Sequence, residues 1–122
     1  MTVEIEKRRV YAIVDFDALD QNVQAMEEKL PQDVGMMAVI KTNAYGHGAK
    51  AIAKHLEDND RISGYAVATA EEALELRKAG IGKMILILGY VFEKDYEDLI
   101  LQDIRFGIYR KDVAQALDAA AE

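Results

Sequence analysis

One segment of the sequence, residues 38–48 (AVIKTNAYGHG), holds the side chains best suited to chemistry. Lys41 follows a short apolar run, and Tyr45 stands between it and two glycines, Gly46 and Gly48. Desolvation of a lysine favours its neutral amine, which can attack an aldehyde and form a Schiff base. A glycine-containing turn before a helix can bind an anion such as phosphate through its backbone N–H groups, and the Tyr45 hydroxyl could donate to the same anion. The residues by themselves indicate an anion site beside a lysine, and they do not establish a reaction.

Each of these residues also has a purely structural explanation. Lys41 could be an ordinary lysine at the end of a strand, the glycines could serve turn geometry alone, and Tyr45 could be a packing residue. His47 is better explained as a loop or helix-start histidine than as a catalyst. The chain has two histidines and no cysteine, so we expect no metal site.

The segments around this motif alternate between strand and helix patterns. Apolar runs predict strands at Tyr11–Asp15, Met36–Ile40, Tyr65–Ala68, Met84–Leu88 and Arg105–Ile108. A helical pattern follows each run. Four of these helices are marked by an apolar face: Leu19, Val23, Met26 and Leu30; Ala49, Ile52, Ala53 and Leu56; Tyr96, Leu99 and Ile100; and Val113, Leu117 and Ala120. The helix after Tyr65–Ala68 is marked by its ends, since it opens on a Thr69–Glu72 capping box and ends near Gly80. This alternation predicts an α/β fold with a parallel sheet, in which Lys41 emerges at the carboxyl end of a buried strand, where α/β folds build their sites.

Length limits the architecture. A complete (β/α)8 barrel takes about 250 residues, and this chain has 122. A doubly wound sheet and part of a barrel both remain compatible with the pattern. No proline-rich or glycine/serine-rich linker divides the chain, so residues 1–122 are expected to form one unit. The last helical pattern runs to Glu122 without a stop signal, which leads us to expect a longer parent protein.

Composition excludes several classes of function. The net charge of −7 argues against a general nucleic-acid binder. The charged beginning of the chain lacks the apolar region of a secretory signal. The longest nearly unbroken apolar run, Met84–Phe92, is far shorter than the roughly 20 residues of a membrane span. We therefore expect a cytoplasmic protein with neither a nucleic-acid nor a membrane partner.

The segment AVIKTNAYGHG resembles the cofactor-lysine signature of the alanine racemase family, usually A-V-x-K-A-N-A-Y-G-H-G, with Thr42 where alanine is common. Three further stretches resemble family segments in the expected order: YAIVDFDALDQNV (11–23), YAVATAEEALELR (65–77) and MILILG (84–89). The resemblance covers nearly the whole chain. It implies a partial (β/α)8 TIM barrel, roughly the first four βα units, with the family's β-rich C-terminal domain absent. It also implies that residues 11–15 could pack with that domain instead of joining the barrel.

The resemblance assigns roles to particular residues. Lys41 would form the Schiff base with pyridoxal 5′-phosphate and would act as one of two bases. Tyr45 would hydrogen-bond the cofactor phosphate, and Leu88 and Val39 would line the cofactor pocket. The implied activity is conversion of L-alanine to D-alanine for cell-wall precursors, by a homodimer.

In the family the second base is a tyrosine from the C-terminal domain of the partner subunit. We therefore expect the 122 residues to be inactive alone, and to associate with one another or with a partner half through their open sheet edges. The alternatives are a pyridoxal-phosphate-binding barrel without turnover, a racemase for serine or another small amino acid, and a folding module without a ligand.

Overall fold

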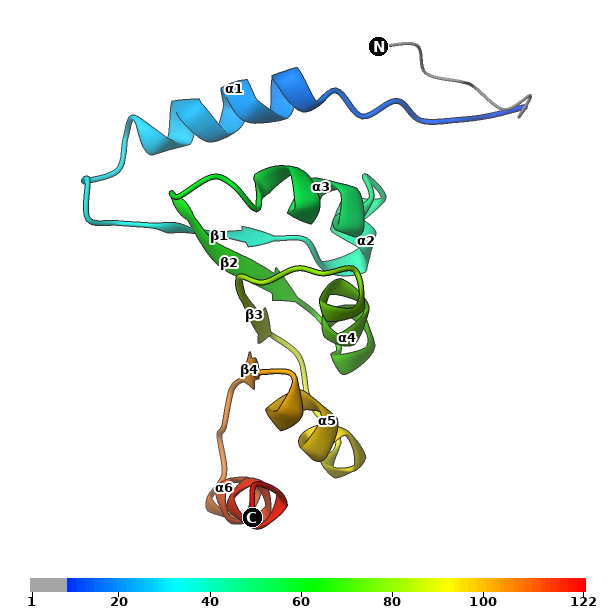
Figure 1. Cartoon of the computed structure of the whole chain (residues 1–122), viewed down its shortest axis with the longest axis vertical. Coiled ribbons are helices and arrows are strands. Elements are labelled where there is room, and N and C mark those ends of the chain that lie inside the picture. Colours follow the sequence, from blue (N-terminus) through cyan, green and yellow to red (C-terminus); the bar gives the residue numbers. More distant parts are fainter. Residues whose placement is uncertain (1–8) are drawn as a thin grey trace.

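A four-stranded parallel sheet forms the centre of the computed structural model, which describes residues 9–122 (Figure 1). The strands are β1 (Met36–Val39), β2 (Ile62–Val67), β3 (Met84–Ile87) and β4 (Ile104–Phe106). Each strand pairs in parallel with the next one along the chain, in the order β1-β2-β3-β4. A doubly wound sheet reverses its strand order at a switch point, whereas a barrel wall proceeds without reversal. The α/β prediction is confirmed, and the uninterrupted order favours part of a barrel.

Helices connect the strands. They are α1 (Phe16–Glu27), α2 (Lys41–Tyr45), α3 (Ala49–Leu56), α4 (Ala70–Lys78), α5 (Tyr96–Leu101), which follows the short 3-10 turn η1 (Glu93–Asp95), and α6 (Lys111–Ala120). Side chains begin two of them: Asp15 Oδ1 accepts from the Ala18 N–H at 3.1 Å, and Thr69 Oγ1 accepts from the Glu72 N–H at 3.2 Å. Within residues 9–122 no helix is both long and apolar enough to cross a bilayer.

The helices between the strands bury one face of the sheet. Tyr65, Ile85 and Ile87 alternate along β2 and β3 with residues of the other face, and all three are fully buried. The Tyr65 hydroxyl donates to the Ala53 carbonyl of α3 at 2.8 Å, which ties this helix to the strand beneath it. The opposite face retains exposed apolar side chains, Val39 and Leu88 among them. The core therefore lies between the sheet and its connecting helices.

Helices α1 and α6 lie at the two ends of the sheet, beyond β1 and β4 (Figure 1). Two contacts attach α1 to α3: the Phe16 ring stacks on the His55 ring, with centroids 4.4 Å apart, and His55 Nε2 lies 2.8 Å from Asp20 Oδ1. Val23 is the buried residue of α1. The helix is thus held through a small number of side chains along one side.

The prediction of a strand at Tyr11–Asp15 is wrong. These residues have no regular secondary structure, and Tyr11 and Ile13 are exposed. Asp15 is extended and serves as the N-cap of α1. A strand needs a neighbour for its backbone groups, and within residues 9–122 none lies beside this segment. Its apolar residues are spaced as in a strand, but its backbone has no partner to pair with.

Candidate active site at the carboxyl end of the sheet

Lys41 lies where the sequence predicts it, directly after β1 at the carboxyl end of the parallel sheet. The strand ends because the Ile40 N–H makes the last ladder contact, donating to the Ala66 carbonyl of β2 at 2.9 Å. Ile40 is buried and Val39 before it is exposed, as the alternation of a strand requires, and at Ile40 the backbone leaves the extended conformation, with φ −122° and ψ 26°. Lys41 itself is half-buried. Its amine is therefore placed at the edge where parallel α/β folds present their reactive groups.

The chain turns after Lys41 in a left-handed conformation. Thr42, Asn43, Ala44 and Tyr45 have φ angles of 54°, 53°, 53° and 55°, and Gly46 follows at 89°. L-residues avoid this region because Cβ approaches the following carbonyl oxygen, at roughly 1–2 kcal/mol per residue. Such strain persists only where the surrounding structure holds it, and it concentrates at functional sites. The turn is therefore a departure from ordinary helix geometry beside the residue best suited to chemistry.

The backbone amides of the second half of this turn are bonded within the turn. The Gly46, His47 and Gly48 N–H groups donate to carbonyls of residues 42–44, at 2.9–3.2 Å, and the Ala49 N–H donates to Asn43 Oδ1 at 3.0 Å. These four amides are consumed and cannot hold an anion in this conformation, so the predicted backbone anion site is wrong for them. His47 Nδ1 lies 2.9 Å from the Ala44 carbonyl, which confirms its interpretation as a loop histidine.

The other predicted site residues, Val39, Tyr45 and Leu88, are exposed at the same end of the sheet as Lys41. Val39, the last residue of β1, and Leu88, the first residue after β3, are 44% and 48% exposed. Pairing places β2 between them, with Val39 opposite Ala66 and Ala66 opposite Leu86, so the side chains stand on one face of one sheet edge. Tyr45, at the end of the left-handed turn, is 60% exposed. Together they offer an amine, a phenol hydroxyl and an apolar wall.

Glu72 belongs to this site although the sequence pattern predicts only a helix cap. In a capping box its carboxylate would reach back to the Thr69 N–H. Instead Glu72 Oε2 accepts from the Ala68 N–H, one residue earlier, and Oε1 accepts from the Thr42 N–H, both at 2.7 Å. The Thr69 hydroxyl half of the box is confirmed. The T-x-x-E spacing could have marked Glu72 as a hydrogen-bonded residue, but the spacing contains nothing about Thr42, which lies 30 positions away.

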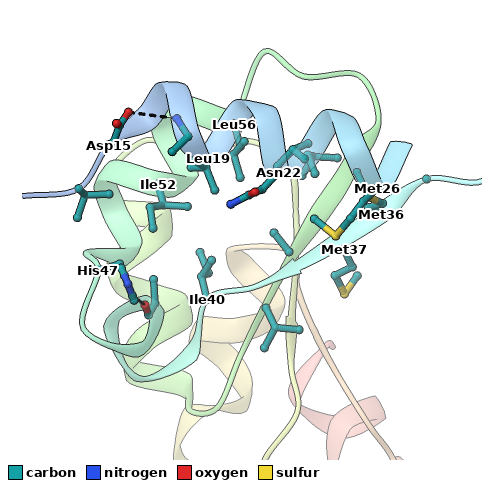
Figure 2. A pocket seen from close by; sticks show the side chains of 18 of the residues that line it. Asp15, Leu19, Asn22, Met26, Met36, Met37, Ile40, His47, Ile52 and Leu56 are labelled. Carbon is teal, nitrogen blue, oxygen red and sulfur yellow. Dashed lines mark hydrogen bonds between the residues drawn. The ribbon is translucent and has the colours of Figure 1, made fainter. Parts of the chain in front are cut away.

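A separate hollow lies between α1 and β1 (Figure 2). It has a volume of about 800 Å³ and a mostly apolar lining, in which Leu19 of α1 faces Ile52 and Leu56 of α3. Val39 and His47 reach its wall, whereas Lys41, Tyr45 and Leu88 do not line it. The hollow is therefore distinct from the site around Lys41. In the part of the chain from residue 9 onward, no group of three or more histidines, aspartates or glutamates could hold a metal ion.

Comparison with known proteins gives a consistent result. Residues 14–122 match the family model described as "Alanine racemase, N-terminal domain". An alanine racemase of Streptococcus equi subsp. zooepidemicus is 46% identical over 90 residues, which are 74% of this chain and 24% of that protein. One from Streptococcus agalactiae is 45% identical over 84 residues, which are 69% of this chain and 22% of that protein. The chain thus spans about a quarter of the length of these relatives.

Solved structures agree with the sequence matches. An alanine racemase structure from Clostridium difficile superposes with a TM-score of 0.83 at 38% identity, covering 86% of this chain and 28% of that one. The structure of the Bacillus anthracis enzyme with bound L-Ala-P gives 0.77 at 40% identity, covering 85% of this chain and 28% of that one. The four-stranded sheet and its helices therefore correspond to part of the fold of these proteins.

Proposed function

The chain belongs to the alanine racemase family, and from that premise we propose that it carries the pyridoxal-phosphate-binding lysine of an amino-acid racemase, with Lys41 in that role. The observation that supports this most strongly is the position of Lys41. It follows β1 and the buried Ile40 at the carboxyl end of the sheet, is itself half-buried, and stands at the start of a strained left-handed turn. That combination is unusual for a lysine with a purely structural role.

The residues around Lys41 fit the chemical groups of pyridoxal phosphate. An amine suits its aldehyde, and exposed apolar surfaces such as those of Val39 and Leu88 suit the face of its ring. The Tyr45 hydroxyl suits its phosphate, and within residues 9–122 no hydrogen bond occupies that hydroxyl. Because the amides of residues 46–49 are consumed inside the turn, we propose that Tyr45 supplies this segment's phosphate contact through its side chain.

When bound, the cofactor would draw electrons from the α-carbon of an attached amino acid and make its C–H bond acidic. The Lys41 amine would hold the cofactor until the amine of the substrate replaces it, and the freed Nζ would then take or return the α-proton on one side of the substrate. Tyr45 would fix the phosphate end, and Val39 and Leu88 would keep water from the ring. Inversion at the α-carbon requires a second base on the opposite side.

We propose that the second base comes from outside these residues, and that alanine is the substrate of the complete assembly. The 122-residue chain should then bind cofactor without converting L-alanine to D-alanine. Incubation of the chain with pyridoxal phosphate and L-alanine, followed by chiral separation, tests this. Turnover by the chain alone would place both bases within it and would contradict the proposal.

The role of Lys41 is tested by adding pyridoxal phosphate to the chain and recording the visible absorbance of a lysine-bound cofactor. Lys41→Ala should abolish the band. Lys78→Ala is the matched control, because Lys78 is an exposed lysine in the last turn of α4, at the opposite end of the sheet from Lys41. The control should keep the band of the parent chain. Equal bands in parent and Lys41→Ala would remove Lys41 from this role.

A further inference from the structure

The left-handed turn after Lys41 needs an external support. Its residues 42–45 contain no glycine, and Thr42 is β-branched, the kind of residue least compatible with a positive φ. The hydrogen bonds inside the turn join its own atoms to one another. Ala44 attaches the middle of the turn to the end of β1, because its N–H donates to the Ile40 carbonyl at 2.9 Å and its side chain is buried in the core. The Thr42 N–H, at the start of the turn, takes no part in these bonds, and a contact from another element has to hold it.

Glu72 provides that contact. Among residues 9–122 it is the one side chain outside the turn that accepts a hydrogen bond from the turn's backbone, through Oε1 to the Thr42 N–H at 2.7 Å. Its other oxygen accepts from the Ala68 N–H, directly after β2, also at 2.7 Å. The Glu72 N–H is held in turn by the Thr69 hydroxyl. One carboxylate therefore joins the carboxyl ends of two neighbouring strands.

The Thr42 N–H belongs to the same rigid peptide plane as the Lys41 carbonyl. Holding this N–H therefore sets ψ of Lys41, and with it the relation between the lysine and the turn that carries Tyr45. The two donors that converge on Glu72 require two acceptor atoms, which an ionised carboxylate supplies. The amide of glutamine has one acceptor oxygen and a nitrogen that would face an N–H group.

We propose that Glu72, as a carboxylate, is a positioning residue for Lys41: it locks the peptide after the lysine and so aims the amine and Tyr45 at one bound cofactor. This inference rests on the proposed role of Lys41. Both carboxylate oxygens of Glu72 accept from backbone N–H groups, so its effect would be transmitted through the backbone of the turn.

The test compares Glu72→Gln with Glu71→Gln. Both glutamates lie in the first turn of α4, so both variants remove the same charge from the same helix end. Glu71 is exposed, whereas Glu72 is half-buried. We expect Glu72→Gln to weaken pyridoxal phosphate binding, read from the visible band, by roughly tenfold or more, because a hydrogen bond to an ionised group contributes about that factor or more. Glu71→Gln should stay within about twofold of the parent.

A readout that needs no cofactor accompanies the titration. In the parent chain, hydrogen exchange at the Thr42 amide should be slow compared with an exposed turn, and Glu72→Gln should accelerate it selectively. A urea denaturation of each variant shows whether a loss of binding is only a loss of folded protein. If Glu72→Gln is too unstable to assay, an unprotected Thr42 amide in the parent chain still overturns the inference.

Three results would overturn the inference: unchanged cofactor affinity in folded Glu72→Gln, equal losses in the two glutamine variants, or an unprotected Thr42 amide in the parent chain. Failure of the proposed function gives a different pattern, in which Lys41→Ala keeps the band of the parent chain. In that case the role of Glu72 toward Lys41 would be rejected. If the Thr42 amide is protected in the parent chain and exchanges faster in Glu72→Gln, Glu72 would still be shown to hold the turn.

Discussion

Glycine and alanine at position 42 should rank in the opposite order from the one they show in an ordinary helix. Thr42 is exposed and has φ 54°. Alanine would keep a Cβ in the left-handed region, at about 1–2 kcal/mol, and glycine would not. Glycine loses about 0.5–1 kcal/mol through the greater freedom of its unfolded chain. The balance makes Thr42→Gly more stable than Thr42→Ala by about 0.5–1 kcal/mol.

Ala51 provides the matched comparison. It is exposed in α3, an ordinary right-handed helix, and is already alanine. Ala51→Gly should destabilise the protein by about 1 kcal/mol. The difference between glycine and alanine therefore changes sign between positions 42 and 51.

The assay is urea denaturation followed by far-UV circular dichroism, since the chain has no tryptophan. The m-value of each variant must match that of the parent for the comparison to report stability. If glycine is the less stable residue at both positions by similar amounts, Thr42 does not hold a left-handed conformation, and the account of the turn is refuted.

Two further predictions concern the core beneath the site. Burial, with a smaller contribution from the Glu57 charge, raises the pKa of Tyr65 above its ordinary value of 10.0. Above pH 10.0 the Tyr65 hydroxyl loses its proton in the unfolded chain and keeps it in the folded chain. The contribution of Tyr65 to the free energy of unfolding is therefore fully present below pH 10.0 and falls above it by up to about 1.4 kcal/mol per pH unit. In Tyr65→Phe this fall in stability with rising pH should disappear. The variant should also lose about 1–3 kcal/mol of stability at neutral pH, because the Ala53 carbonyl loses its donor. An alkaline denaturation in which Tyr65→Phe loses stability with pH as steeply as the parent would contradict the assignment. Gly64→Ala should destabilise the protein by about 1–3 kcal/mol, because its Cβ would stand 2.5 Å from the Met84 carbonyl oxygen. Gly82→Ala is the control: its Cβ meets nothing nearer than Glu57 Oε1 at 3.7 Å, so thermal melts of the two variants should show a loss of stability for Gly64→Ala and almost none for Gly82→Ala.

Periodicity predicts most of the elements, although burial follows the predicted faces only in part: Met26 of the predicted α1 face is 51% exposed, Leu30 lies beyond the end of α1 at Glu27, and α6 has no buried residue. The apolar face Ile52, Ala53 and Leu56 is buried in α3, as the spacing indicates. Each predicted barrel strand forms, with boundaries that differ by a few residues, such as Ile62–Val67 in place of 65–68. The strand predicted at residues 11–15 does not form, because a strand pattern depends on side-chain spacing and does not reveal whether a neighbouring strand is present to pair with it.

The site is predicted in part, for reasons that individual residues make clear. The place of Lys41 follows from the strand before it, and the family signature indicates Tyr45, Val39 and Leu88. The left-handed turn could not be predicted, because residues 42–45 lack the glycine or repeated asparagine that normally signals positive φ. The second role of Glu72 depends on a contact between residues 42 and 72, and local spacing carries no information on such a pair.

Reductive trapping tests the central claim most directly. The chain is incubated with pyridoxal phosphate, reduced with borohydride, digested and mapped by mass spectrometry. The account predicts that the cofactor is fixed on the peptide that contains Lys41, at a stoichiometry near one per chain, with little label on exposed lysines such as Lys78. Label spread over the surface lysines, or concentrated on a lysine other than Lys41, would contradict it.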